Sequence, residues 1–597
     1  MKPSKLYSNR SDVLAPIEFQ RDLNVILAEI RLPENRNLDT HNLGKSTLGR
    51  LLDFGFLAKR DAKFFLFKHL DRFESFVFFL EIELLNGNYV TVRRSVAEAT
   101  KIAFKKHVAR HQDLSTLPDR EWDHVDVPFG RAKELLDSIL DWRAVKPWHY
   151  RKGLGYFLRS QEDFRDVFQL GRFANSHADW KPFLAQILGF DADLITKHYS
   201  KEYELKEEQQ KALTIRQELG GEIEDAGKID GLLLLKREEV NKKQKMLDAF
   251  DFRSQDKNFT KQIVDQIDEN IATLNQRRYS LNKNLKKVIS SLEEDRILFN
   301  PNDAAELFQE AGVFFAGQIK RDFQQLIAFN KAITNERRSY LIEERNEIEA
   351  ELKSINSKLD MLGKRRSEML VFLSSTDTFA KYKQLSNELI ALRADIEGLE
   401  RQRSFAQRLQ QLRTSIRNLE EEKNHFQAAI EADVEAKNAD ADSLFSRVRI
   451  FFNEIVEEVI DQRALLSVSI NKHGHVDFRA ELLNDSGIAT SADRGFSYKK
   501  LLCIAFDLAV LRAHLDNAFP RFAFHDGVFE TLDDRKKENL ITVIRRYSDF
   551  GIQSIITLID SDLPPRDEHD PVFSASEIVA LLHDEDDSGR LFKMKPW

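Results

Sequence analysis

The sequence contains few of the residues that interrupt helices or cross-link chains. Its single cysteine, Cys503, excludes an internal disulfide and a cysteine-based zinc site. Glycine and proline number only 23 and 13 among 597 residues, whereas 31% of the residues are charged. This balance favours long charged helices over a loop-rich all-β protein.

Long apolar runs and an excess of basic charge are also absent. No run approaches the roughly 20 apolar residues that cross a bilayer, and the polar start of the chain is unlike a signal peptide. We therefore expect a cytoplasmic protein with no membrane partner. The net charge of −8 argues against a uniformly basic DNA-coating protein, although it is compatible with a local basic surface. The length suggests about three or four domains.

A candidate phosphate-binding loop lies near the start of the chain. An apolar run at 23–27 predicts a strand, and the segment 48–52 predicts a helix. Between them stand Gly44, Lys45, Ser46 and Thr47. This order of strand, loop and helix is the one in which a P-loop binds phosphate, with Lys45 on the β- and γ-phosphates and Ser46 on Mg²⁺. Asp39 replaces the first glycine of that pattern, and a polar helix start is the alternative interpretation.

A β-hairpin is predicted downstream of this loop. Residues 76–84 and 89–94 are rich in apolar, β-branched and aromatic side chains, and they flank an Asn-Gly turn at 86–87. Basic residues in and after the hairpin are candidate DNA contacts: Arg93, Arg94, Lys105 and Lys106. We expect Lys105 and Lys106 to lie on a helix, where a solvated charged face is the more common explanation.

The middle of the chain, from about 201 to 440, has the heptad spacing of a coiled coil. Apolar residues recur at intervals of three and four over 267–292, 341–362 and 385–399. A helix-breaking segment at 299–303 and a phenylalanine-rich stretch at 304–330 separate two arms. We therefore predict an antiparallel helical hairpin that reverses in a small apical module. An ordinary helical bundle is the alternative.

From residue 441 strands and helices alternate again. Strands are predicted at 465–470, 476–482, 521–526 and 554–559, and the first two are expected to form a second hairpin across His473 and Gly474. The strand at 521–526 ends in the carboxylate of Asp526. A long apolar helix is predicted at 498–515, with Ser497 as an N-cap that could present a hydroxyl and free amides to an anion.

The order of these parts resembles that of the structural-maintenance-of-chromosomes (SMC) ATPases and of related RecN-type and DNA-break-repair ATPases. The resemblance implies an α/β ATPase head of the ABC type, formed by N- and C-terminal lobes, with an inserted antiparallel coiled-coil hairpin and a small apical module. The expected parts are an N-terminal head lobe at 1–200, an ascending coiled coil at 201–295, an apical module at 296–335, a descending coiled coil at 336–440 and a C-terminal head lobe at 441–597.

The resemblance also implies a site for ATP and Mg²⁺, completed by the head of a second copy. The residues expected to bind ATP are Asn42, Gly44, Lys45, Ser46, Thr47 and, from the second copy, Ser497. The residues expected to bind Mg²⁺ are Ser46, Gln161 and Asp526. The residues expected to act in hydrolysis are Asp526, Gln161 and Glu530.

Several positions depart from the pattern of the family. Gly527 replaces the carboxylate that normally follows the strand-ending aspartate, so slow hydrolysis is expected unless Glu530 or His525 takes over. The signature Leu-Ser-Gly-Gly is replaced at 494–497, and residues 557–560 stand where a switch histidine is expected.

These departures, with the sequences at 41–47, 156–161 and 497–502 and the C-terminal residues 589–592, are similar to one bacterial branch of the family. That branch supplies the SMC-like subunit of Lamassu-type anti-phage and anti-plasmid defence systems. It implies a dimer of heads that closes with ATP on foreign DNA and controls a nuclease effector subunit, beside a small accessory subunit. The alternatives are a non-hydrolysing coiled-coil scaffold and a chromosome-organising or DNA-repair ATPase.

Overall fold

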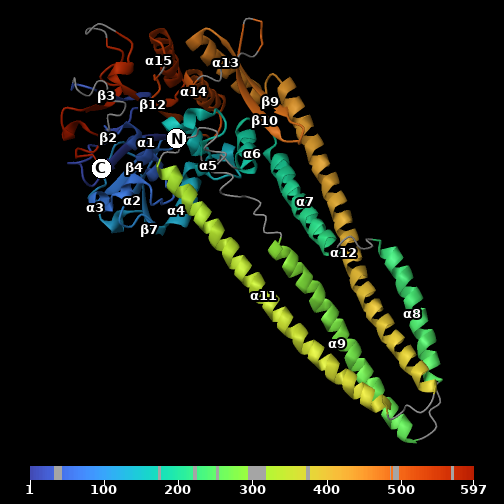
Figure 1. Ribbon diagram of the computed structural model, residues 1–597. Helices are drawn as coiled ribbons and strands as arrows, with labels where there is room; N and C mark the ends of the chain where they lie inside the picture. Colours follow the sequence, from blue (N-terminus) through green and yellow to red (C-terminus); the bar gives the residue numbers. More distant parts are fainter. Residues whose placement is uncertain are drawn as a thin grey trace. The chain divides into compact units, whose positions relative to one another are not determined.

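The computed structural model describes residues 1–32, 43–171, 176–219, 225–249, 255–293, 317–371, 377–484, 486–488, 496–530, 532–565 and 571–596. They form two compact units. Residues 1–205 and 419–597 form the first, which we call the head unit, and residues 206–418 form the second, which we call the helical unit (Figure 1). No helix in the described part of the chain has the length and apolar character needed to cross a bilayer.

A parallel five-stranded sheet is the centre of the head unit. Its strands in order are β13 (Ile578–His583), β3 (Leu23–Glu29), β12 (Gln553–Ile559), β11 (Phe522–Asp526) and β8 (Leu158–Arg159). All neighbouring pairs are parallel. Strand β3, from the start of the chain, lies between two strands from its end, as the blue and red ribbons of Figure 1 show. The two ends of the chain therefore build one sheet.

The strands of this sheet are apolar because helices cover them. All five residues of β11 and six of the seven in β3 are buried, as expected of a parallel sheet with helices on its faces. The helices packed on these strands are α1 (Lys45–Gly55), α5 (Tyr150–Phe157), α14 (Phe496–Ala513) and α15 (Asp534–Asp549). The unit also contains α2 (Phe65–Lys68), α3 (Leu70–Phe73), α4 (Phe129–Leu140), α6 (His177–Ile187) and α13 (Leu444–Ile460), together with the first part of α7 (Ala192–Leu219) and the last part of α12 (Asp377–Ala439).

Two antiparallel sheets complete the head unit. The larger has the order β2 (Ile17–Glu18), β1 (Lys2–Ser8), β4 (Val77–Glu83), β5 (Tyr89–Ser95), β6 (Lys101–His107) and β7 (His124–Pro128). The smaller pairs β9 (Arg463–Ile470) with β10 (Val476–Leu483). Both hairpins predicted from the sequence are present, and Gly87 and Gly474 turn them with φ angles of 83° and 80°.

The basic residues of the larger sheet correct two expectations. Lys105 and Lys106 lie on strand β6 and not on a helix, because pairing with β5 decides their conformation. Arg94 is only 1% exposed, and its guanidinium donates hydrogen bonds to the carbonyls of Phe54 and Ala99. Arg94 therefore supports the interior of the head unit and is not available for contact with DNA.

Long helices make up the helical unit. They are the later part of α7 (Ala192–Leu219), α8 (Ala226–Asp248), α9 (Gln255–Glu293), α11 (Gly317–Val371) and the earlier part of α12 (Asp377–Ala439). Residues of the predicted heptads are buried between α9 and α11: Leu281, Val288, Ile348, Leu352 and Ile355. Of the predicted apical module at 296–335, residues 296–316 lie outside the described residues, and the remainder belongs to α11, which begins at Gly317.

The helices of this unit form two antiparallel helix pairs. In the first, Lys243 of α8 forms an ion pair of 2.5 Å with Glu388 of α12. In the second, Arg277 of α9 forms an ion pair of 2.9 Å with Glu351 of α11. From the first ion pair to the second, the residue number rises from 243 to 277 in one partner and falls from 388 to 351 in the other. The partners therefore follow the order expected of one antiparallel hairpin.

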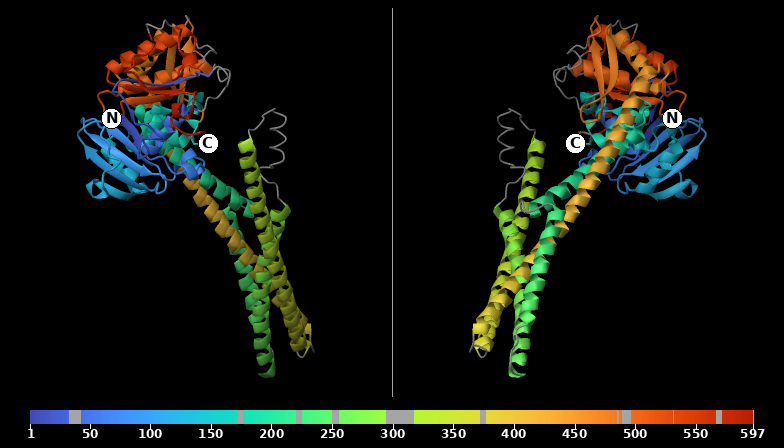
Figure 2. Two further views of the ribbon diagram at one scale, coloured as in Figure 1. Left: turned by 90° about the vertical axis from the view of Figure 1, so that its left-hand side faces the viewer. Right: turned by 90° about the vertical axis from the view of Figure 1, so that its right-hand side faces the viewer.

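The two helix pairs also contact each other. Tyr382 and Ser386 of α12 donate hydrogen bonds to Asp265 and Asp268 of α9, at 3.0 and 2.6 Å. These partners advance together, so α9 runs parallel to α12. The ends of four helices contribute to one apolar cluster, formed by Leu247, Val264, Leu370, Tyr382 and Leu389. The sequence predicted one reversal, in the apical module, whereas the chain also reverses between α8 and α9 and between α11 and α12 (Figure 2).

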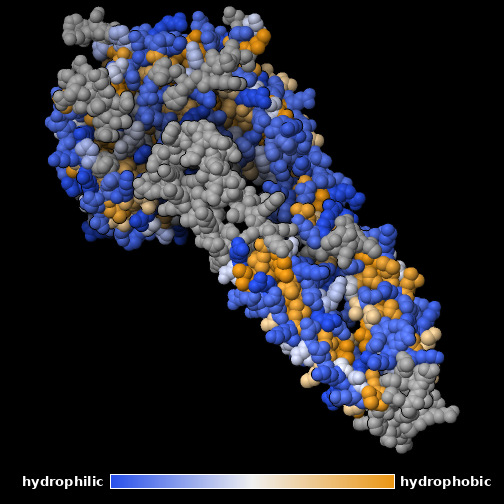
Figure 3. All heavy atoms as spheres, in the orientation of Figure 1, coloured by the Kyte–Doolittle hydropathy of each residue, from blue (hydrophilic) through white to orange (hydrophobic). Residues whose placement is uncertain are grey.

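The surface of the helical unit retains apolar side chains outside these seams. Leu234 and Leu235 of α8 are 71% and 68% exposed. In the face drawn in Figure 3, apolar patches follow these helices, whereas the visible head unit is mainly hydrophilic. The head unit buries most of its apolar residues in one continuous core.

Candidate nucleotide-binding site

The predicted phosphate-binding loop leads directly into α1. Gly44 has a φ of 97°, and Lys45, Ser46 and Thr47 form the first turn of the helix. The N–H groups of such a turn have no partner within the helix and point out of its end. Asp39 and Asn42 fall in the segment 33–42, which lies outside the described residues.

The C-terminal segment packs against this loop. The N–H of Leu591 donates a hydrogen bond of 2.9 Å to the carbonyl of Leu43. A Cβ on Gly44 would lie 2.7 Å from the Cβ of Leu591, so both the φ angle and the close approach require glycine. Phe592 is buried against the rings of Phe65 and Phe73. The sequence contained no signal for this contact beyond the resemblance at 589–592.

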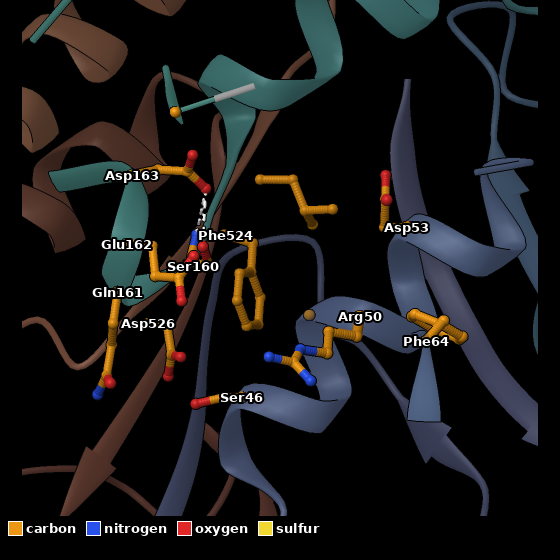
Figure 4. A pocket seen from close by; sticks show the side chains of 13 residues that line it. Ser46, Arg50, Asp53, Phe64, Ser160, Gln161, Glu162, Asp163, Phe524 and Asp526 are labelled. Carbon is orange, nitrogen blue, oxygen red and sulfur yellow. Dashed lines mark hydrogen bonds between the residues drawn. The ribbon is translucent and has the colours of Figure 1, made fainter. Parts of the chain in front are cut away.

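Ser46, Gln161 and Asp526 line one cavity of about 450 Å³. They come from the first turn of α1, from the short helix at Gln161–Arg165 and from the end of β11. Figure 4 shows the Ser46 hydroxyl facing the Asp526 carboxylate, with Gln161 beside Asp526. The structure therefore brings three predicted residues together. The described residues that line the cavity do not include Gly44, Lys45 or Thr47.

The Lys45 ammonium lies close to the acidic side of this site. Burial lowers the pKa of Lys45, and the charge of Asp526 is the largest opposing influence. Asp562 and Glu530 also act on Lys45. The pKa of Asp562 is raised by burial and by the charge of Glu530. A cation among several carboxylates is thus part of the site.

Thr557 orients the carboxylate of Asp526. Its hydroxyl donates a hydrogen bond of 2.5 Å to Oδ1 of Asp526 and accepts one of 3.0 Å from the N–H of Gly527. Thr557 and Asp526 are both buried on neighbouring strands. Thr557 begins the segment where the resemblance expected a switch histidine.

Glu530 occupies the space beside Gly527. Its Oε1 accepts a hydrogen bond of 2.8 Å from Gln161, and its Oε2 accepts one of 2.7 Å from Lys500. Gly527 has a φ of 69°, and a Cβ there would lie 2.6 Å from Oε1 of Glu530. Gly527, which stands where the resemblance led us to expect a carboxylate, therefore makes room for a carboxylate from three residues later.

Lys500 was missed by the sequence analysis. It lies on α14, is 1% exposed and also donates a hydrogen bond of 2.7 Å to the carbonyl of Gly527. A lysine within a helix that is otherwise largely apolar was the available signal. The helix begins at Phe496, so Ser497 lies in its first turn and not at its N-cap. The side chain of Ser497 is outside the description.

A buried ion pair fixes the loop that contains Gln161. Arg159 donates hydrogen bonds of 2.7 and 2.9 Å to the Asp507 carboxylate, and both side chains are fully buried. The same guanidinium donates to the carbonyls of Asp163 and Val167 in that loop. His525 lies 3.1 Å from Asp507. Its side chain points away from that of Asp526, because side chains alternate along a strand.

Comparison with known proteins gives one family and several structural neighbours. A family model described as "Uncharacterised protein conserved in bacteria (DUF2326)" matches residues 455–596. No curated protein sequence matches the chain. The description of the matched family assigns no function.

Three solved structures of SMC heads are similar to the chain. The SMC head with a coiled coil and joint from Pyrococcus yayanosii is 14% identical, with a TM-score of 0.34, over 94% of this chain and 92% of that one. The SMC head with an extended coiled coil from Pyrococcus furiosus, bound to the C-terminal domain of ScpA, is 11% identical, with a TM-score of 0.31, over 94% and 90%. An SMC head bound to the C-winged helix domain of ScpA is 15% identical, with a TM-score of 0.17, over 27% and 42%.

Proposed function

We propose that the head unit binds Mg²⁺ and ATP and that the chain is a slow ATPase of the SMC type. The observation that carries the proposal is the meeting of Ser46, Gln161 and Asp526 at one cavity from distant parts of the sequence. Their hydroxyl, amide and carboxylate oxygens are hard ligands of the kind that Mg²⁺ prefers. The start of α1, with its free N–H groups, is a site suited to phosphate.

Each side chain has a defined role in this proposal. Mg²⁺ would neutralise charge on the β- and γ-phosphates. Lys45 would place its ammonium on the same phosphates, and Ser46 and Asp526 would hold the cation. Thr557 keeps the Asp526 carboxylate in one orientation through its 2.5 Å hydrogen bond.

Glu530 is our candidate for the group that orients the attacking water. It lies beside Gln161 and takes the place of the carboxylate that Gly527 lacks. Its carboxylate accepts hydrogen bonds from Gln161 and Lys500, which reduces its availability as a base. Slow turnover follows. The same contacts favour the second candidate, a scaffold that binds ATP without hydrolysing it.

The wider role is proposed from the sequence resemblance. Ser497 and the start of α14 in a second copy would complete the site, so that ATP closes a homodimer through the heads. In the Lamassu-type branch, closure on foreign DNA would control a nuclease effector subunit, with a small accessory subunit in the complex. Among the basic candidates, Arg93 and Lys105 already pair with Asp119 and Asp123.

The substitution Lys45→Ala tests the proposal. We expect the variant to lose ATP binding and ATP-dependent dimerisation, measured by fluorescence titration and light scattering. Lys59→Ala, which changes an exposed lysine just beyond α1, is the matched control. Unchanged ATP affinity in Lys45→Ala would contradict the phosphate-binding role. Phosphate release by the unaltered protein separates a slow ATPase from the scaffold.

A further inference from the structure

Three metal-binding side chains converge away from the nucleotide site. His198 and Glu202 lie four residues apart on α7 and so share one face of the helix. His475 lies in the turn between β9 and β10, after Gly474. One potential ligand atom from each of the three residues lies within 4.8 Å of the others. All three residues belong to the head unit.

The buried ring of His198 has an unused nitrogen in this cluster. His198 is 1% exposed, and its Nε2 is buried with no hydrogen-bond partner in the described part of the chain. Buried polar atoms are nearly always paired, so an unpaired one calls for a ligand or another explanation. The ring centroids of His198 and His475 are 5.7 Å apart. The unpaired nitrogen therefore belongs to a ring beside a second imidazole.

The charges around the cluster suit a cation. Glu202 places a carboxylate oxygen 2.8 Å from Nε2 of His475. Tyr199 stacks on His475 at 4.9 Å between centroids and holds that ring in place.

We propose that His198, Glu202 and His475 bind one Zn²⁺ ion, with water at the fourth position. Two imidazoles and one carboxylate are common zinc donors, whereas Mg²⁺ prefers oxygen ligands alone. The three donor atoms now lie within 4.8 Å of one another. Zinc bonds of about 2.0 to 2.2 Å would draw them slightly closer together. The ion would tie the second and third turns of α7 to the β9–β10 turn.

Zinc binding to the full chain tests this inference. Bound metal is first removed from the protein with EDTA and dialysis. The protein is then titrated with ZnCl₂ by isothermal titration calorimetry, and bound zinc is quantified by inductively coupled plasma emission spectrometry. We expect one zinc per chain and at least a tenfold loss of affinity in His198→Ala and in His475→Ala. His473→Ala, in the same turn, is the matched control and keeps the affinity. Co²⁺ in place of zinc should give the visible absorption of a tetrahedral site.

A second variant and a second readout separate metal binding from folding. Glu202→Gln keeps the size of the side chain and removes only its charge, and circular dichroism checks that each variant is folded. Zinc should raise the Tm of the unaltered protein and leave that of Glu202→Gln nearly unchanged. Failure of the unaltered protein to retain zinc would overturn the inference. So would unchanged affinity in the variant with both His198→Ala and His475→Ala.

Discussion

The ammonium of Lys500 donates a hydrogen bond of 2.7 Å to the carboxylate of Glu530. This contact connects α14 to the segment that follows β11, and Lys500 reinforces it through the carbonyl of Gly527. We propose that the first turn of α14 contributes to the site of a second copy. The same helix thus also holds Glu530, the proposed base of its own site. A change in the position of α14 would therefore be felt at Glu530.

Glu530→Gln should separate binding from hydrolysis. The amide cannot act as a base, so we expect phosphate release to fall by about 10²- to 10⁴-fold. ATP affinity should stay nearly constant because Lys45 and Ser46 are untouched. Glu538→Gln, an exposed residue of α15, is the control. Equal rates in the two variants would show that Glu530 is not the base.

Gly527→Ala should displace Glu530. The added Cβ would lie 2.6 Å from the Glu530 carboxylate, at a φ of 69°. Gly551→Ala is the matched control, because Gly551 has a φ of 80° but open space around it. Both changes should lower the free energy of unfolding by about 1–2 kcal/mol, measured with urea. A selective loss of phosphate release is expected in Gly527→Ala alone, and a similar loss in both would argue against displacement.

Asp507→Asn should strongly destabilise the head unit. It leaves the fully buried Arg159 without its carboxylate, and breaking a buried pair costs about 3–5 kcal/mol. Glu454→Gln removes the partly exposed partner of Arg512 and should cost no more than about 1 kcal/mol. Denaturant unfolding measures both. A small effect in Asp507→Asn would mean that other groups compensate Arg159.

Stability should fall in mild acid because of His514. Burial lowers the pKa of this residue from 6.5 to about 4. Between those values the unfolded chain binds a proton that the folded chain does not, so stability is lost as the pH falls from 6.5 toward 4. The loss from pH 7 to pH 5 should be about 2 kcal/mol in the free energy of unfolding.

His514→Gln checks this pH dependence. The variant should lose less stability between pH 7 and pH 5 than the unaltered protein, with denaturant unfolding as the measurement. The amide of glutamine can replace the hydrogen bond of His514 to the carbonyl of Ile187. Other titrating groups are common to both proteins and cancel in the comparison. Identical slopes would remove His514 as the cause.

Local patterns predicted the elements that depend on neighbours in the sequence. The strand at β3, the glycine before α1 and the hairpin turns at Gly87 and Gly474 follow from short segments. The apolar run ending at Asp526 predicted β11 in the same way. Heptad spacing predicted the residues buried between α9 and α11.

Contacts between distant segments could not be predicted in this way. Lys105 lies on a strand because β5 pairs with it, and Arg94 is buried where its guanidinium reaches the carbonyl of Phe54 in α1. Lys500 and Glu530 meet only once α14 packs beside β11. The sequence analysis also missed the reversal between α8 and α9. A helical hairpin whose arms fold back on themselves has the same heptad pattern as one whose arms are fully extended.

The two helix pairs of the helical unit restrict where residues can be inserted into or deleted from its helices. One inserted residue in α9 would rotate every later side chain by about 100° around the helix axis, away from its seam with α11. The contacts of α9 with α12 would lose their match at the same point. Insertions and deletions in this part of the chain should therefore occur in whole heptads, balanced between the partner helices.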